Sequence, residues 1–473
     1  MEILSQFEGM MLIGGFFLAM VALIFMLRKR EQTKEEFLVA NRRAPWLLAA
    51  FSMAATWVWA PAMFTAAEKA YTQGWVGVFW FVIPNILTLI LFAFFANKMR
   101  KIRPEGWTFS DYIREKYSNR AHNMFLIESF GLQTCSLAVQ LLAGATIFHK
   151  VTGLPFFWTT IILAAIPLLY SLTRGIRGNI ASDFVKMGFI VAVLLLGLPI
   201  MTSNAGVDTF FNGLGGLTGD FGNFFDKTGI AVMLSFGIPT TIGLLSGTFG
   251  DQMFWQRVFA VKPNHVKRTM ITAACIFGIV PIALSCFGFF AAGAELPIAD
   301  TQLVNVSAVI AFTPKWFLYL FFLLILSGLI STVDSILCAV SSVAGHDVVK
   351  RLEERSGLEL NSVKVARAAM VLVAILAIGI ANIPGITITY LFLFYGTLRS
   401  SVMLPTIFAI KGYKMSESGL FYGILASLVI GLPIFAIGNL NGWVPMIVTG
   451  SLLTIGLSGA ISLLKKDKTI ETI

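Results

Sequence analysis

Long apolar runs recur along almost the whole chain and constrain its fold more than any other feature of the sequence. Hydrophobic residues make up 57% of the 473 residues and charged residues only 13%, whereas a soluble domain carries about 25% charged residues. Because about twenty apolar residues suffice for a helix to cross a bilayer, the sequence predicts an all-α integral membrane protein with about 13 transmembrane helices. The predicted spans cover residues 9–27, 46–69, 76–97, 122–148, 155–172, 182–202, 229–248, 269–292, 316–345, 365–383, 387–409, 419–437 and 442–463.

The connections between these runs are short, so neither a soluble domain nor an appended signalling domain is expected. Glu2 and Glu8 precede the first run, and no small-residue cleavage pattern follows it. A removable signal peptide would begin with basic residues. The first run is therefore expected to remain as a helix, and the chain is expected in the lipid bilayer of the cell (cytoplasmic) membrane as a multi-pass protein.

The basic residues are distributed asymmetrically. The chain has 35 Lys and Arg residues and a net charge of +10. All but five of them, including Lys186 and Arg257, fall in the predicted connections on one side of the membrane or in the span ends next to these connections; the exceptions are Lys69, Lys150, Lys227, Lys315 and Arg399. Because basic residues collect on the cytoplasmic side of helical membrane proteins, the pattern predicts an outside N-terminus and an inside C-terminus. It also explains the charge without nucleic acid as a partner.

Several kinds of chemistry have no support in the sequence. The four cysteines lie in apolar spans without CxxC spacing, so neither disulfides nor a thiolate metal site is indicated. The four histidines are scattered, and no phosphate-binding loop for ATP is present. The glycine-rich run 212–217 is expected to be a flexible loop in an outward connection. Enzyme activity is not predicted, and uphill transport would have to draw on an ion gradient.

One apolar run contains a dense group of polar residues. Within residues 328–335, Ser331, Thr332, Asp334 and Ser335 follow Gly328 in the middle of a predicted span. An ionisable residue at the bilayer centre costs roughly 2.5 to 3.5 kcal/mol on insertion scales, and such residues mark functional sites. The segment is therefore predicted to form part of a cation site.

Glycine and proline interrupt two spans that lie five spans apart. Residues 52–62 contain Pro61 in the middle of the second span, and residues 235–243 contain Pro239 in the seventh. Interruptions at corresponding positions indicate broken helices and a midplane site in inverted-repeat transporters. Spans 2 to 6 and spans 7 to 11 are therefore predicted to be two structural repeats of five helices each.

Three motifs, in order along the chain, resemble those of the sodium/solute symporter family. The hydroxyl pair Ser331-Thr332 resembles the family's eighth core helix, and 251–257 (Asp-Gln-Met-Phe-Trp-Gln-Arg) resembles its signature after the seventh helix. Residues 182–186 resemble the Thr-Asp-x-x-Gln start of the sixth helix, with serine for threonine and Lys186 for glutamine. The resemblance implies a LeuT-like 5+5 inverted-repeat core and a symporter coupled to Na+.

The resemblance divides the chain into five parts, in which two repeats of five helices are flanked by additions. These are 1–45, an extra N-terminal helix and inner loop; 46–202, the first repeat; 203–228, an outward loop; 229–410, the second repeat; and 411–473, two additional helices and an inner tail.

The main sodium site implied by the resemblance uses oxygens from the broken helix and from the eighth core helix. Carried over residue by residue, its ligands are the carbonyls of Ala55, Val58 and Gly328 and the hydroxyls of Ser331 and Thr332. Hard cations take oxygen ligands, and an unwound helix frees carbonyl groups. Hydroxyls that bond back to the preceding helical turn are the alternative for Ser331 and Thr332.

Some family members bind a second cation through an aspartate of the sixth helix. Here the corresponding residues are Asp183, Ser331 and Ser335, with Asp334 at a position where that pattern has serine. The two carboxylates could hold a second cation, share a proton, or pair with the intramembrane Arg399. The simpler alternative is that Asp183 caps its helix.

The substrate interpretation depends on aromatic motifs. Residues 56–60, 66–71, 74–80 and 247–258 resemble the urea-transporting branch of the family. A urea-like solute needs a few convergent polar groups between aromatic faces. By position along the core helices, the candidate substrate residues are Trp57, Trp59, Thr248, Phe394 and Tyr395. Packing or membrane-interface belts are the alternative role for these aromatics.

Other functions remain open at this point. A proton-coupled or sodium-coupled transporter of an amino acid, a carboxylate or a polyamine could use the same fold. A polyamine would require unpaired acids within the spans, for which Glu68, Glu128 and Asp334 are the further candidates. A channel would show flux independent of sodium, and a sensor would carry an appended domain. The sequence has no feature that indicates an oligomeric state.

Overall fold

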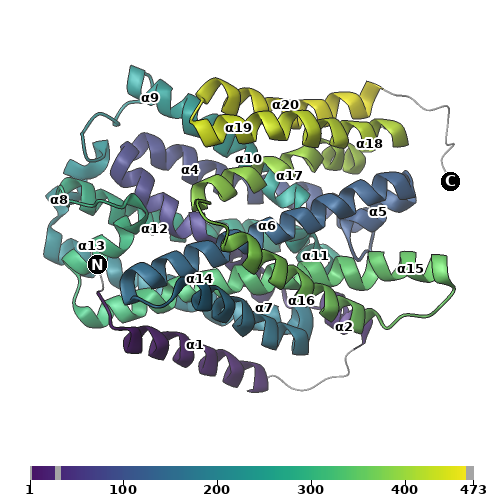
Figure 1. Ribbon diagram of the computed structural model, residues 1–473, viewed down its shortest axis with the longest axis horizontal. Helices are drawn as coiled ribbons and strands as arrows, with labels where there is room; N and C mark the ends of the chain where they lie inside the picture. Colours follow the sequence, from purple (N-terminus) through teal and green to yellow (C-terminus); the bar gives the residue numbers. More distant parts are fainter. Residues whose placement is uncertain (1–2, 27–32, 465–473) are drawn as a thin grey trace.

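The chain folds almost entirely into helices, as the recurring apolar runs predict. The computed structural model describes residues 3–26 and 33–464. Within these ranges no strand forms, apart from one isolated parallel bridge between Ala44 and Val261. Most of the long helices run side by side along the long axis of the molecule (Figure 1). In hydrocarbon this arrangement pairs the backbone N–H and C=O groups within each helix, apart from those at the helix ends.

Among the described residues, eleven helices are long and apolar enough to cross a membrane. Two of them, α4 (Ala60–Ile102) and α7 (Phe156–Ala205), contain 43 and 50 residues, although roughly twenty suffice for one crossing. Each kinks at a glycine with positive φ, Gly74 (φ 51°, ψ −151°) and Gly175 (φ 56°, ψ −150°). The predicted spans 155–172 and 182–202 thus lie in one helix with a kink between them.

The second predicted span is broken, as its proline indicates. Helix α3 (Trp46–Trp57) ends three residues before α4 begins at Ala60, and Val58 between them has non-helical angles (φ −81°, ψ 72°). Pro61 stands in the first turn of α4, where the missing N–H removes no helical hydrogen bond. The break leaves the carbonyls at the end of α3 without helical partners.

The seventh predicted span is not broken, so the prediction of an unwound segment in residues 235–243 is wrong. Helix α9 (Lys227–Val232) continues through a π-helical turn, η3 (Met233–Gly237), into α10 (Ile238–Gly250). Pro239 follows directly after this wider turn. A local π-helical turn adjusts the hydrogen-bonding pattern near a proline, which has no N–H to donate. The helix therefore continues past Pro239 without a break.

The glycine-rich run 212–217 is packed, so the expectation of a flexible loop is wrong. It follows α8 (Val207–Asn212) and forms the 3-10 turn η2 (Gly213–Gly215). An added Cβ on Gly213 would lie 1.9 Å from the carbonyl oxygen of Phe289 in α12 (Val266–Gly293). Leu217 donates its backbone N–H to the carbonyl of Tyr71 at 2.8 Å. The glycines therefore let this segment lie directly against α4 and α12.

The other helices surround these elements, with α1 at one edge of the molecule and α18, α19 and α20 at the opposite edge (Figure 1). Helix α14 packs against α7, α6, α16 and α3 in the interior. The bounds are α1 (Gln6–Met26), α2 (Lys34–Val39), η1 (Ala40–Arg42), α5 (Phe109–Lys116), α6 (Asn119–Thr152), α11 (Gln252–Ala260), η4 (Pro263–His265), η5 (Thr301–Leu303), α13 (Val304–Phe312), α14 (Lys315–Ser342), η6 (Val343–Val348), α15 (Val349–Ser356), α16 (Ser362–Ala381), α17 (Ile388–Lys411), α18 (Glu417–Ala426), η7 (Ser427–Gly431), α19 (Leu432–Asn441) and α20 (Val444–Leu464).

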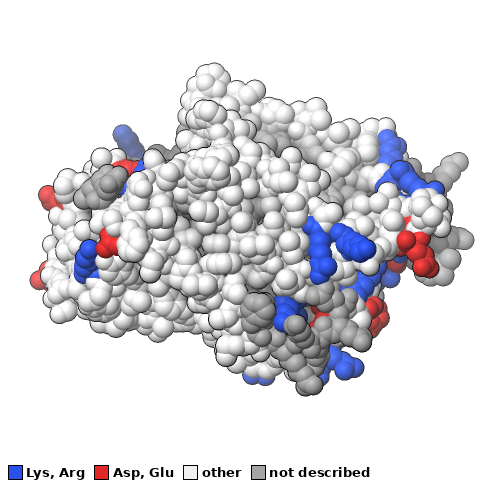
Figure 2. Space-filling model, turned by 60° about the horizontal axis from the view of Figure 1, so that its bottom comes forward, with Lys and Arg blue, Asp and Glu red and all other residues white. Residues whose placement is uncertain are grey.

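Charged side chains gather at the ends of the molecule and leave its middle uncharged on the face drawn in Figure 2. Most Lys and Arg residues on this face lie at the end that carries α5 and α15, where α20 also ends, and α1 starts at the opposite end (Figures 1 and 2). Three residues of the predicted basic side are buried, Arg100, Lys186 and Arg257. The assignment of the basic end to the cytoplasm remains a prediction.

Candidate functional site

The break between α3 and α4 faces the polar segment of α14. Thr332 Oγ1 lies 3.2 Å from the carbonyl oxygen of Val58, 3.4 Å from that of Thr56 and 3.3 Å from that of Gly328. The threonine is 1% exposed. A hydroxyl carries a single proton, so Thr332 satisfies only one of these three carbonyls. Four buried oxygen atoms thus converge, and such a set suits a hard cation.

Glycine at position 328 permits this convergence. An added Cβ on Gly328 would lie 2.5 Å from Met63 Sδ and 3.2 Å from Val58 Cγ1, so a larger residue would require the Met63 and Val58 side chains to move. Val58 donates its N–H to the carbonyls of Ala54 and Ala55, both at 3.1 Å. The structure therefore brings Val58, Gly328 and Thr332 together, whereas the Ala55 carbonyl is engaged within the last turn of α3.

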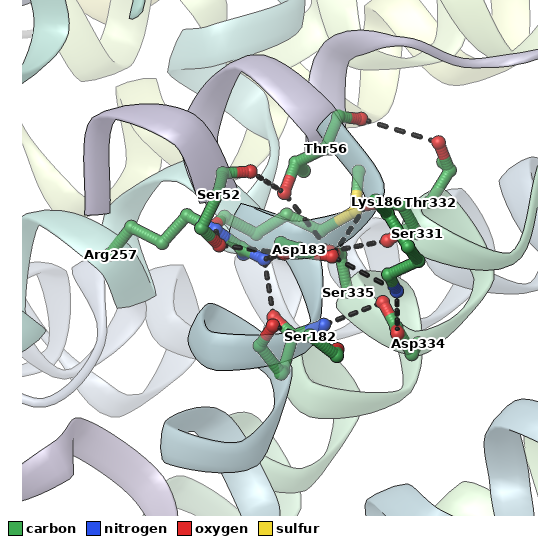
Figure 3. A network of polar contacts seen from close by, with 12 residues as sticks. Ser52, Thr56, Ser182, Asp183, Lys186, Arg257, Ser331, Thr332, Asp334 and Ser335 are labelled. Atoms are coloured by element: carbon green, nitrogen blue, oxygen red, sulfur yellow. Dashed lines mark hydrogen bonds and ion pairs between the residues drawn. The ribbon is translucent and has the colours of Figure 1, made fainter. Parts of the chain in front are cut away.

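Ser331 does not turn its hydroxyl toward these oxygens but toward Asp183 (Figure 3). Asp183 Oδ1 accepts from Ser331 Oγ at 2.5 Å and lies 3.1 Å from Lys186 Nζ. Its Oδ2 accepts from Ser52 Oγ at 2.6 Å and from Arg257 Nη2 at 3.1 Å. Each carboxylate oxygen of Asp183 thus has two partners. Because Asp183 lies within α7, the alternative that it caps a helix is wrong.

Asp334 pairs with Lys186 and not with Arg399. Lys186 Nζ lies 2.5 Å from Asp334 Oδ2, which also accepts from the hydroxyl of Tyr170. Asn179 Nδ2 donates to Asp334 Oδ1 at 2.5 Å. Lys186 therefore connects the two carboxylates, one on its own helix α7 and one on α14. The distance from Lys186 to Asp334 is the shorter of the two.

Arg257 completes this network from α11. Its Nη2 donates to Asn179 Oδ1 at 2.5 Å and to Ser335 Oγ at 2.6 Å, and its Nε donates to Ser52 Oγ at 3.0 Å. Ser335 in turn donates to the Ser331 carbonyl at 2.7 Å. The side chains of Asp183, Asp334, Lys186 and Arg257 are all 0% exposed. Two carboxylates and two fixed cations thus form an electrically balanced group, called the charge network below.

A second polar group lies among aromatic rings. The guanidinium carbon of Arg399 lies 5.4 Å, 5.5 Å and 4.9 Å from the ring centroids of Trp57, Trp59 and Tyr395, within the range of cation–π attraction. The Trp59 ring also contacts Tyr395 at 5.4 Å. Arg399 Nε donates to the carbonyl of Gly243 at 3.0 Å. These four residues, called the arginine cage below, include three of the five predicted substrate residues.

The other two predicted substrate residues lie outside the arginine cage. Thr248 is fully buried, with its hydroxyl 3.1 Å from that of Thr88. Phe394 stacks on Tyr390 with ring centroids 6.0 Å apart. Phe392, two residues earlier on α17, contacts Trp59 at 4.9 Å instead, because the helical rotation turns position 394 away from that ring.

Several polar atoms near Arg399 have no hydrogen-bond partner among the described residues. They are Arg399 Nη2, Glu128 Oε1, Asp251 Oδ2 and Trp59 Nε1. Glu128 and Asp251 are buried and near enough to interact electrostatically with Arg399, while Glu68 pairs with Lys69 at 3.4 Å. An unpartnered buried polar group costs about 1 to 3 kcal/mol, so these atoms are suited to a polar ligand.

Comparison with known proteins identifies the family of the chain. Residues 37–427 match the model of the sodium:solute symporter family. The chain belongs to this family. The family is one of transporters rather than enzymes, and the eleven apolar helices of this chain are those of a multi-pass membrane protein.

Curated relatives of this symporter family member are distant but extensive. A rice protein named urea-proton symporter DUR3 is 21% identical over 83% of this chain and 60% of its own length. The probable urea active transporter 1 of Schizosaccharomyces pombe is 22% identical over 83% of this chain and 63% of its own length. The high-affinity choline transporter 1 of Caenorhabditis elegans is 24% identical over 72% of this chain and 61% of its own length. The chain thus spans about 60% of the length of these relatives.

Solved structures confirm the LeuT-like fold expected for the family. A Na+-coupled sialic acid symporter, described in a substrate-bound outward-open state with a novel Na+ site, has a TM-score of 0.80 at 18% identity and covers 98% of this chain and 99% of its own. MHP1, a nucleobase-cation-symport-1 family transporter, has a TM-score of 0.58 at 14% identity, over 91% of this chain and 94% of its own. At these identities the likeness shows the fold alone.

The sequence did not reveal which partners the basic residues of the two groups have. Lys186 stands three residues after Asp183 and so shares its helix face, which was a usable signal. Arg257 and Arg399 gave a weaker signal, because each is an arginine in or next to an apolar span. Asp183 is 74 residues from Arg257 and Gly243 is 156 residues from Arg399 along the chain, and only the tertiary fold brings these pairs together.

Proposed function

We propose that this chain is a sodium-coupled secondary active symporter that imports a small polar solute across the cell membrane by alternating access. The observation that carries the proposal is the convergence of the Thr332 hydroxyl with three carbonyls at the break between α3 and α4. Sodium would be bound there by the carbonyls of Val58 and Gly328 and the hydroxyl of Thr332, and the Ala55 carbonyl would join them when its bond to the Val58 N–H opens. Ser331 would join them when its hydroxyl turns from Asp183.

Alternating access requires two halves that move against each other. We propose residues 46–202 and 229–410 as the two inverted repeats, with 1–45 and 411–473 as additions. Transporters of this architecture bind ion and solute near the bilayer midplane, at discontinuous helices between the repeats. The break at Val58 belongs to the first repeat, and Thr332 to the second. Sodium binding would therefore join the two repeats.

The favoured solute is urea or a related amide. Its carbonyl oxygen would accept from the unpartnered Arg399 Nη2, and its N–H groups would donate to the unpartnered oxygens of Glu128 and Asp251. The flat molecule would stack on the rings of the arginine cage. The names of the rice and fission yeast relatives, which describe urea transport, support this choice over the sugar or choline carried by other relatives.

The same residues favour one alternative substrate class. A guanidinium pairs with a carboxylate through two parallel hydrogen bonds, and nearby acids would accept an ammonium group. An amino acid would therefore suit the arginine cage as well as an amide does. Proton coupling is the alternative for the ion, because the rice relative is named a urea-proton symporter.

Uptake by the purified chain in proteoliposomes tests these proposals. Labelled urea, proline, acetate and putrescine are each supplied with an inward sodium gradient, with an inward proton gradient, and with neither; empty liposomes are the control. We expect urea to accumulate only with the sodium gradient. Accumulation driven by protons alone would contradict the proposal that sodium is the coupling ion. Accumulation of proline instead of urea would favour the amino-acid alternative. Urea flux without either gradient would indicate a channel.

A further inference from the structure

A lysine ammonium lies where the sequence predicted a second cation. The predicted ligands were Asp183, Ser331 and Ser335, with Asp334 as an additional carboxylate. Lys186 Nζ lies 3.1 Å from Asp183 Oδ1 and 2.5 Å from Asp334 Oδ2, and its side chain is 0% exposed (Figure 3). The ammonium is therefore in contact with both carboxylates that a second sodium ion would use.

The remaining ligands of such an ion are also engaged. The Ser331 hydroxyl donates to Asp183 Oδ1, and Arg257 Nη2 donates to the Ser335 hydroxyl at 2.6 Å. Both oxygens of Asp183 already have two partners each. With two carboxylates and two fixed cations, a further positive charge at this position would be uncompensated in a low-dielectric interior, where this is most costly. The charge network does not fit a second sodium ion.

We infer that Lys186 is a tethered cation that replaces a second sodium ion, so that this transporter binds a single sodium ion per cycle, at Thr332. The inference concerns the stoichiometry of the proposed function and rests on it only for the ion at the main site. A free ion would leave in each cycle and loosen the contact between α7 and α14. Lys186 is attached to α7 and reaches Asp334 on α14, so it keeps this contact closed throughout transport.

Counting bound sodium tests the inference directly. Equilibrium binding of radioactive sodium to the purified full chain at about pH 8, where free carboxylates are ionised, should give about one ion per chain. Lys186→Gln removes one positive charge and leaves two carboxylates against Arg257, so this variant should bind about two ions per chain. Lys186→Asn, with a shorter side chain, is the second variant should Lys186→Gln not fold, and it should also bind about two.

Two control variants separate this effect from general damage. Lys186→Gln combined with Asp334→Asn restores the charge balance and should return the count to about one. Lys69→Gln removes a lysine that is paired with Glu68 at 3.4 Å on α4, away from the network, and should leave the count at about one.

Each result has a distinct meaning. About two sodium ions on the wild-type chain would overturn the inference, as would about one on a folded Lys186→Gln or Lys186→Asn chain. If the wild-type chain binds none and Lys186→Gln binds about one, the replacement of a sodium ion by Lys186 stands, whereas the single sodium ion proposed at Thr332 is wrong.

Discussion

The charge network and the arginine cage are both buried, charged and built on the core helices, yet they differ in how completely their polar atoms are paired. In the charge network, both oxygens of Asp183 and of Asp334 have partners. In the arginine cage, Arg399 Nη2 and the nearby oxygens of Glu128 and Asp251 have none among the described residues. Complete pairing of the polar atoms indicates a structural role, and unpaired buried polar atoms indicate a ligand-binding role.

The physical reason is the cost of leaving a buried polar group unpaired. A satisfied network makes the fold specific, and a partly satisfied one carries a penalty. An incoming solute that supplies the missing partners removes that penalty, which adds to its affinity. The arginine cage therefore fits a binding site, whereas the charge network fits a permanent connection between α7, α11 and α14. Four predictions test this difference.

The largest effect is expected from removing one member of the charge network. Asp334→Asn leaves Lys186 without a full counter-charge, and breaking a buried pair in this way costs about 3 to 5 kcal/mol of stability. Thermal unfolding in detergent should show a large drop in unfolding temperature. Lys186→Met combined with Asp334→Leu should recover most of it. A drop as small as that of a surface substitution would mean that the network is not the permanent connection proposed.

The next effect should appear in transport more than in stability. Arg399→Leu removes the donor proposed for the solute, and a hydrogen bond to a charged group contributes about 1.5 to 3 kcal/mol. The urea concentration for half-maximal uptake should rise about ten- to a hundredfold. Arg268→Leu is the matched control, because this arginine also lies over a ring, Trp46 at 3.7 Å, but on the surface. Unchanged uptake in Arg399→Leu would remove Arg399 from the solute site.

The third prediction concerns the sodium site beside the charge network. Thr332→Ala removes one ligand oxygen, and the sodium concentration for half-maximal uptake should rise about tenfold, which corresponds to about 1.4 kcal/mol. Thr332→Ser retains the oxygen and should stay near the wild type. Thr202→Ala serves as control, since its hydroxyl bonds back to Leu198 at 2.8 Å within α7. Equal sodium dependence in all three variants would argue against sodium binding at Thr332.

The smallest effect should come from an aromatic residue outside the arginine cage. Phe394→Leu should change urea uptake by no more than about twofold, as for a substitution remote from the site, whereas Tyr395→Leu should reduce it clearly. Side-by-side uptake assays with both variants measure the difference. If Phe394→Leu were the more damaging change, Phe394 would belong to the solute site and the prediction would be wrong.

The sequence predicted the features that depend on local chemistry. The break in the backbone before Pro61 could be predicted because proline limits helix geometry locally. The cation ligands expected at Gly328, Ser331 and Thr332 remain a prediction. Side-chain directions were less accessible: Ser331 turns to Asp183, and Phe392 takes the place expected for Phe394. The pairing of Lys186 with Asp334 could not be foreseen, because a charge on a long flexible side chain can reach either neighbouring helix.

Helix continuity was predictable only in part, for a similar reason. Pro61 and Pro239 look alike in the sequence, but one follows a break and the other a π-helical turn. Neighbouring helices decide which of these a proline produces. The kinks at Gly74 and Gly175 are also invisible without knowledge of what lies against them, since glycine in a membrane span often serves packing alone.

The packed glycine-rich turn η2 has a consequence for engineering. An added Cβ on Gly74 would lie 2.7 Å from the carbonyl oxygen of Leu214, so the kink of α4 and this turn hold each other in shape. A fluorescent reporter inserted into η2 would therefore distort the core helix α4. Residues 354–359 at the other end of the molecule are exposed, and Gly357 has open space around it. That segment is therefore the place to insert a label that leaves the core helices undistorted.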